Sequence, residues 1–300
     1  MTGDVAPDAG PAFGFAVVTI GSAPVLAVVR EDDVVPLSRL VDRPPADFAE
    51  LLEVWDEVVA EVAAGWSTAG AGPTSYATGA VDFHVPGVAA PAVWCAGANY
   101  ADHVAELGFA DVGDRAFHFL VPPTALNRHR GTVHPPVHAD MLDWEVELAV
   151  VIGRTARHVA PQDAADHIAG YTIANDLTVR GQRHPIFGVD WVAAKSADGT
   201  TPLGPTIVPR CFVTEPRDLE LKLTVNCITR QRSSSARMLV GIEDQIAALS
   251  RVVTLRPGDV ILTGSPAGTA AAHHGAYLTG GDVIEAEITG LGVLRTEIAR

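Results

Sequence analysis

Residues 143–153 read DWEVELAVVIG, in which acidic residues alternate with apolar ones and then give way to an unbroken apolar run. Successive side chains of an extended strand point to opposite faces, so Asp143, Glu145 and Glu147 should share one face and the intervening apolar residues the other. Like charges this close repel one another and lose hydration unless a positive group lies between them. We therefore expect a divalent cation here. A solvated acidic strand edge is the alternative, but it leaves the apolar partner face unexplained.

A third candidate ligand is Asp176, which lies at the end of a second apolar stretch, residues 170–177. Ligation by carboxylate oxygens alone suits magnesium, calcium or manganese rather than zinc or copper. The sequence thus predicts that Glu145, Glu147 and Asp176 form one metal site.

Composition narrows the class of protein. A chain of 300 residues predicts two domains, or one domain with an appendage, at about 150 residues per domain. The formal net charge is 21 − 36 = −15, so nucleic acid would be repelled and is not expected as a partner. The three cysteines match neither a disulfide framework nor a paired zinc signature, which indicates a reducing compartment.

The N-terminal residues carry acids and no basic start, and no apolar run reaches the roughly 18 to 20 residues that cross a bilayer. We therefore expect a cytoplasmic protein that does not contact membranes.

Short apolar runs at 16–20, 25–29 and 34–37 alternate with turn-like pairs and predict a small antiparallel sheet. Glycines within 281–292 predict a closing hairpin near the other end.

A helix is predicted after this first sheet. Asp47 and Glu50 are spaced as a capping pair. From Phe48 to Val62, apolar residues recur every three to four positions, so one helical face should be buried up to a stop at Gly65.

The segment PGVAAP at 86–91 interrupts both patterns and indicates a linker. From about Val93 the chain shows many short strands rich in valine and isoleucine, with brief helical stretches such as 242–253. We therefore predict an α+β, β-dominated fold, with a small N-terminal α+β domain over 1–88 and a main domain over 89–300.

Two further segments could carry chemistry. His103 and Glu106 lie three residues apart, on one face of a helical turn. There the carboxylate would orient the imidazole, as in a general-base dyad. The alternative is a contact at the protein surface without a catalytic role. Lys195 follows an apolar run and could neutralise an anionic intermediate, although a buried salt bridge is the commoner use. The turn LTGSPAG, 262–268, could hold a substrate carboxylate or oxyanion through its backbone N–H groups, or be only a tight turn.

Six segments, taken in order, strongly resemble the fumarylacetoacetate hydrolase family. They are GANY (97–100) with His103 and Glu106, DWEVELAVVIG (143–153), GYTIAND (170–176), Lys195-Ser196, PLGP (202–205), and PGD (257–259) running into Thr263-Gly264. The resemblance covers roughly residues 93–298 and implies a mixed β-roll catalytic domain, usually a homodimer, with a divalent metal that is commonly magnesium, or else Mn²⁺ or Ca²⁺.

The resemblance also implies a role for each matching residue. The implied metal ligands are Glu145, Glu147 and Asp176. The implied catalytic residues are His103 and Glu106, on a lid that orders when substrate binds, and Lys195. The implied substrate-binding residues are Tyr100, Arg180 and Ser265.

The implied activity is hydrolytic cleavage of a carbon–carbon bond in a 1,3-dicarbonyl or 2-oxo acid, such as an acylpyruvate or fumarylacetoacetate-like compound, through a metal-bound enolate. The alternatives are an isomerase, tautomerase or decarboxylase acting on hydroxymuconate-like or oxaloacetate-like acids, or a non-catalytic metabolite-binding protein. Three departures from the family pattern, Val121, Cys227 and the segment 179–183, are expected on the substrate side. They favour an unusual substrate, for example from aromatic-compound degradation.

Overall fold

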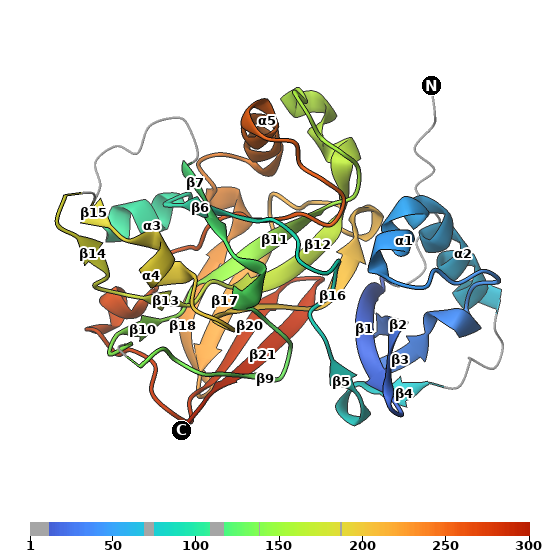
Figure 1. The fold of residues 1–300 in the computed structure, drawn as a ribbon, viewed down its shortest axis with the longest axis horizontal. Helices are drawn as coiled ribbons and strands as arrows, with labels where there is room; N and C mark the ends of the chain where they lie inside the picture. The colour runs from blue at the N-terminus through green and yellow to red at the C-terminus, as the bar shows by residue number, and fades with distance from the viewer. Residues whose placement is uncertain (1–11, 69–74, 109–116, 138, 187) are drawn as a thin grey trace.

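The computed structural model describes residues 12–68, 75–108, 117–137, 139–186 and 188–300. Figure 1 shows a smaller N-terminal unit, in blue, beside a larger body made mostly of strands. The predicted β-dominated α+β fold is confirmed.

One long mixed sheet runs through both parts of the molecule in the order β4-β3-β2-β1-β16-β12-β11-β19-β6-β7, with β5 beside β1 and β8 beside β16. Its strands are β1 Gly14–Ile20, β2 Ala23–Arg30, β3 Asp33–Pro36, β4 Tyr76–Ala77, β5 Asp82–Phe83, β6 Val93–Gly97, β7 Phe117–Val121, β8 Leu126–Asn127, β11 Val146–Ile152, β12 Ile168–Asn175, β16 Thr201–Pro209 and β19 Val260–Leu262. The predicted antiparallel sheet of the first 37 residues is β1 to β3.

A second sheet has the order β18-β17-β20-β21-β9, and two short pairs join β10 to β13 and β14 to β15. These strands are β9 Gly131–Val133, β10 Leu142–Asp143, β13 Thr178–Val179, β14 Arg183–His184, β15 Gly188–Val189, β17 Glu220–Val225, β18 Ile228–Ser234, β20 Val283–Ile288 and β21 Gly292–Ile298. The antiparallel pair of β20 and β21 is the predicted closing hairpin.

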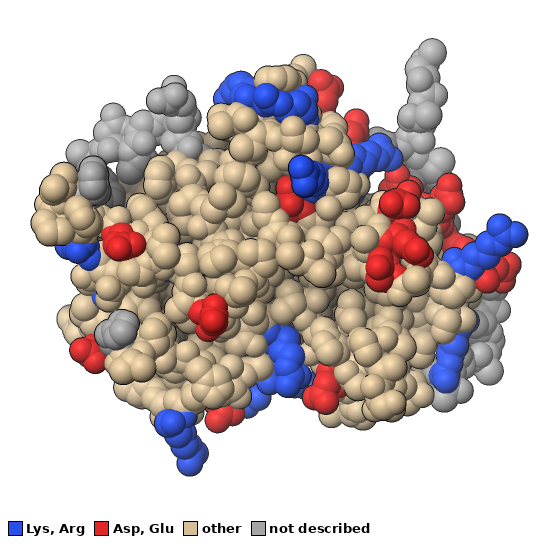
Figure 2. Space-filling model, viewed as in Figure 1, with Lys and Arg blue, Asp and Glu red and all other residues tan. Residues whose placement is uncertain are grey.

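The α-helices are few and short. They are α1 Phe48–Glu53, α2 Trp55–Thr68, α3 Ala101–Glu106, α4 Trp191–Lys195 and α5 Ile242–Val252. Within the described part of the chain, none has the length and apolarity that crossing a membrane requires. Acidic side chains gather over α1 and α2 on the face drawn in Figure 2, whereas the centre of that face carries few charges.

The predicted N-terminal helix is correct in its start and wrong in its continuity. The Asp47 carboxylate accepts hydrogen bonds from two backbone N–H groups of the first turn, which caps the helix. At Val54 the chain leaves helical geometry, so α1 and α2 are separate helices. Gly65 does not end the second one, which continues to Thr68. A stripe of apolar residues reports which side is buried but not whether the axis bends.

The β11 strand lies in the middle of the long sheet, and all seven of its residues are buried. Val146 and Leu148 pack in one hydrophobic cluster together with the second sheet, whereas Ala149 and Val151 pack in another cluster on the opposite face. The strand is therefore covered on both faces, which explains why it is apolar almost throughout.

The N-terminal unit joins the larger body through the long sheet, because Phe15 of β1 pairs with Ile207 of β16. The division into domains over 1–88 and 89–300 stays a prediction.

Candidate active site

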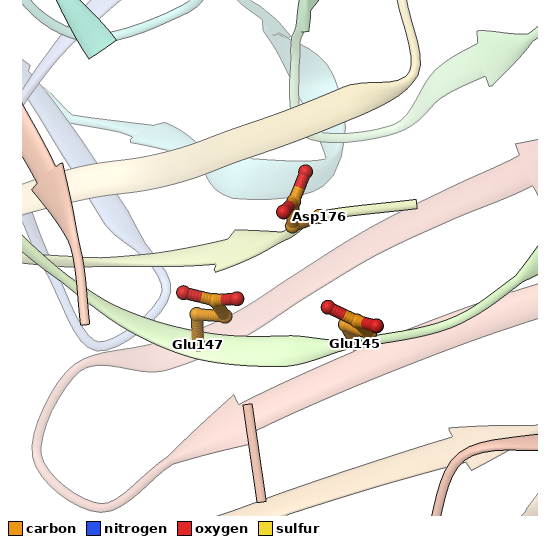
Figure 3. A group of neighbouring side chains, drawn as sticks. All are labelled: Glu145, Glu147 and Asp176. Carbon is orange, nitrogen blue, oxygen red and sulfur yellow. The ribbon is translucent and has the colours of Figure 1, made fainter. Parts of the chain in front are cut away.

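Three buried carboxylates meet where β11 begins and β12 ends (Figure 3). One oxygen from each of Glu145, Glu147 and Asp176 lies within 4.8 Å of the others. Glu147 pairs with Ala174 in the ladder, and the Asp176 N–H donates to the Glu145 carbonyl at 2.9 Å, so the register brings the acids together. The predicted grouping of these three residues is thus present.

Asp143 does not belong to this group, contrary to the expectation that three acids share one face. The alternation is interrupted, because β10 pairs with β13 while β11 pairs with β12, and residues 144 and 145 lie between the two strands. The Asp143 carboxylate instead accepts hydrogen bonds from the Arg180 Nε at 2.8 Å and the Ala270 N–H at 2.8 Å.

Two cations lie against the acids. The Lys195 Nζ contacts Glu145 Oε2 at 2.7 Å and Asp176 Oδ2 at 2.6 Å, and an Arg180 guanidinium nitrogen contacts Glu145 Oε1 at 2.5 Å. Burial alone would raise the pKa of Glu145, but Lys195 and Arg180 outweigh it and lower that pKa to about 2. Lys195 is therefore both a buried salt-bridge partner and a neighbour of the acids.

The charges do not balance without a further cation. With all four carboxylates ionised, Asp143 and the three grouped acids would supply four negative charges, against two positive charges from Lys195 and Arg180, so the buried cluster would carry an excess of 2 − 4 = −2. The Asp176 Oδ1 atom is buried and has no hydrogen-bond partner. A divalent cation would cancel the excess and use that oxygen, and an all-carboxylate donor set suits a hard cation. The residues present fit such an ion.

Metal binding should depend on pH through Glu147. Burial, and next the charge of Asp176, raise the pKa of Glu147 well above its ordinary value. The folded, metal-free protein therefore holds this proton more tightly than the unfolded chain, and it loses stability as the pH rises above the usual carboxyl range. A metal must displace the proton, so its affinity should increase with pH.

We expect Mn²⁺ to raise the melting temperature by about 5 °C more near pH 8 than near pH 5.5. Thermal unfolding with Mn²⁺ and with a chelator, in matched buffers, measures the difference. An equal shift at both values would contradict a protonated carboxyl at this site.

The His103 and Glu106 side chains lie on α3 and contact one another. The His103 Nδ1 lies 2.9 Å from Glu106 Oε2, and Glu106 Oε1 accepts the Gly268 N–H at 2.9 Å. This second bond fixes the carboxylate that orients the imidazole. Residues 109–116, which follow α3, lie outside the described residues, so the lid stays a prediction.

The turn after β19 differs from the expectation that its free N–H groups hold substrate. The Gly264 N–H donates to Glu147 Oε2 at 2.6 Å, and the Gly268 N–H donates to Glu106. At these positions the turn binds the protein's own carboxylates, and so it positions Glu147 and Glu106 relative to one another.

Ser265 lines the cavity described below, and its hydroxyl accepts a hydrogen bond from Gln231 Nε2 at 2.9 Å. Gln231 is buried and also accepts the Val146 N–H at 2.9 Å, at the start of β11. Sequence reasoning missed Gln231, because a glutamine in a polar strand gives no signal of burial. Tyr100 is fully buried among core residues and does not belong to the cavity lining, so its expected role in substrate binding stays a prediction.

A cavity of about 600 Å³ opens onto this cluster. Its charged and polar lining includes Glu145, Asp176, His103, Lys195, Arg180 and Ser265. Its apolar wall, also missed from the sequence, is formed by Phe117, Phe119 and Trp191. The alternation of Phe117 and Phe119 in one strand was the available signal.

The departures from the family pattern lie in different places. Residues 179–183 line the cavity, as expected. Val121 is buried in the core, and Cys227 is exposed in the turn between β17 and β18, so the expectation is wrong for both. The φ of Cys227 is 66°, in the left-handed region that favours glycine, so this position serves the turn.

Known proteins resemble this chain in sequence and in fold. Residues 92–299 match the family model described as fumarylacetoacetate (FAA) hydrolase C-terminal. Oxaloacetate tautomerase YisK of Bacillus subtilis is 36% identical over 235 residues, which are 76% of this chain and 76% of that protein.

Two solved structures have the same fold over nearly the whole chain. The maleylpyruvate hydrolase of Sphingobium sp. SYK-6, solved with manganese (II) and pyruvate, has a TM-score of 0.77 and 27% identity, covering 95% of this chain and 98% of that one. The 5-carboxymethyl-2-hydroxymuconate delta-isomerase of Mycobacterium smegmatis has a TM-score of 0.74 and 29% identity, covering 96% and 98%.

Proposed function

The chain belongs to the fumarylacetoacetate hydrolase family, and from that premise we propose that it is a divalent-metal-dependent enzyme that hydrolyses a carbon–carbon bond in a 2-oxo acid or 1,3-dicarbonyl compound. The observation that carries the proposal is that His103, held by Glu106, lines the same cavity as Glu145 and Asp176. A base and a metal-binding group of acids thus face one substrate space.

A cation held by Glu145, Glu147 and Asp176, most simply Mg²⁺, would act as a Lewis acid toward substrate oxygens. The protein's own groups do the rest. Glu106 accepts the hydrogen bond from His103 Nδ1, which leaves Nε2 free to take a proton from water. The resulting hydroxide adds to the carbonyl carbon. When the bond to the neighbouring carbon breaks, the electron pair leaves with that carbon as an enolate, and the proton held on His103 Nε2 is returned to it, which gives a carboxylic acid and a second carbonyl product.

Lys195 would offset the negative charge that develops on substrate oxygen. The Ser265 hydroxyl accepts from Gln231, so its own proton can be donated to the substrate. These two groups act in the transition state, where the developing charge is largest.

Tautomerisation is the second candidate, because the chain is 36% identical to an oxaloacetate tautomerase. It needs the same base but moves a proton between carbon and oxygen without adding water. The shared cavity would serve either reaction.

Incubation with acylpyruvates and oxaloacetate in H₂¹⁸O, with Mg²⁺ or a chelator, separates the candidates. Hydrolysis gives two products and ¹⁸O in the released acid, whereas tautomerisation changes only the enol absorbance. We expect metal-dependent cleavage of an acylpyruvate. Enol conversion without cleavage would support the tautomerase, and no metal-dependent turnover of either substrate would refute the proposed function. The homodimer also stays a prediction.

A further inference from the structure

The cavity is much larger than its reactive end requires. At about 600 Å³, it falls in the range that encloses drug-sized ligands. Glu145, Asp176, Lys195 and His103 account for only part of the lining, where a 2-oxo acid group would react. The apolar wall formed by Phe117, Phe119 and Trp191 is left for another part of the substrate.

That wall is an aromatic stack. The rings of Phe119 and Trp191 lie 4.6 Å apart at an interplanar angle of 26°, and those of Phe117 and Trp191 lie 5.3 Å apart. Phe117 is 50% exposed although it is large and apolar. Stacked rings with an open face provide a surface on which a flat apolar group can pack.

The helix α4 contributes to both the charged and the aromatic parts of the lining. Trp191 is its first residue and Lys195 its last, and both line the cavity. Residues four apart lie on one helix face, separated by about 6 Å along the axis. A substrate with its reacting oxygen near Lys195 would therefore place a substituent a few bonds away against Trp191.

The solvent-exposed part of the cavity lining includes apolar side chains as well. Leu107, Val189 and Leu239 all line the cavity, and all are exposed. Exposed apolar side chains that gather around one opening indicate a ligand site, whereas scattered ones do not.

We infer that the substrate is a 2-oxo acid whose far end is an apolar, ring-sized group packed on Trp191 and Phe119, rather than a second carboxylate. This inference rests on the proposed function and names its substrate class. The competing arrangement would place a distal carboxylate on Arg183, which also lines the cavity.

Calorimetry on the full chain with Mn²⁺ tests this inference by comparing the affinities of three ligands. Pyruvate has no substituent, phenylpyruvate carries a ring, and 2-oxoglutarate carries a distal carboxylate. Burial of the ring should make phenylpyruvate bind about 10- to 100-fold more tightly than pyruvate. We expect 2-oxoglutarate to gain nothing.

Trp191→Ala should remove most of the gain in affinity of phenylpyruvate over pyruvate. The affinity for pyruvate should stay unchanged, and this result would also show that the site of the variant is folded. Val192→Ala is the matched control, because Val192 follows on the same helix and is 73% exposed. Equal affinities for pyruvate and phenylpyruvate, or a preference for 2-oxoglutarate that Arg183→Ala abolishes, would overturn the inference alone. Failure of all three ligands to bind would refute the proposed function, and the inference with it.

Discussion

Replacing Glu147 by glutamine is expected to abolish divalent-metal binding and to lower kcat/KM by about 10³-fold or more. The substitution keeps the shape of the side chain and an oxygen that can accept the Gly264 N–H, so the turn should stay in place. It removes the negative charge that a cation needs. Calorimetry with Mn²⁺ and steady-state kinetics on the best acylpyruvate measure the two effects.

The stability of the variant provides the complementary test. Glu147 is buried beside Asp176, whose charge opposes its ionisation. The metal-free glutamine variant should therefore be at least as stable as the metal-free native protein at neutral pH. Glu297→Gln, at an exposed strand position, is the control and should change neither the Mn²⁺ affinity nor the stability of the metal-free protein. Undiminished Mn²⁺ affinity in Glu147→Gln would refute the assignment of the metal ligands.

Replacing His103 by alanine should lower kcat by about 10² to 10⁴-fold, the usual contribution of a positioned general base. Metal affinity should remain as in the native protein, because none of the three grouped acids accepts a hydrogen bond from His103. The expected result is thus a separation of binding from catalysis. Single-turnover kinetics at saturating Mg²⁺ measures it, together with calorimetry.

Glu106→Gln is the informative companion variant. The two oxygens of Glu106 accept from His103 and from the Gly268 N–H, and an amide offers only one oxygen to these two donors. We expect a loss of kcat smaller than in His103→Ala. Turnover that is unchanged in His103→Ala would show that another group removes the proton.

The turn that follows β19 explains how the group of acids and the pair of His103 and Glu106 are held in position relative to one another. Its Gly264 N–H binds Glu147 of the acidic group, and its Gly268 N–H binds Glu106 of the dyad. At Gly268, φ is 99° and an added Cβ would lie 2.3 Å from the Arg230 carbonyl oxygen. A side chain there would move the turn, and with it both functional groups.

Much of the fold could be read from local patterns. Alternation in the sequence predicted that Glu145 and Glu147 lie together, and the early apolar runs predicted β1 to β3. The same rule failed for Asp143, because the chain changes strand partner between β10 and β11. Alternation holds only while a strand is continuous, and no residue type in 143–146 signals the break.

The sequence by itself determined the chemistry that is available: buried carboxylates on an apolar strand, a histidine with a carboxylate one helical turn away, and a β-dominated chain. Only the tertiary structure decided which groups meet. It brought Arg180 to Asp143 and Glu145, and it placed Trp191 and Phe119 on one wall. The physical reason is that side-chain type and spacing follow from local geometry. Contacts between distant segments depend on sheet register and on the packing of the whole chain.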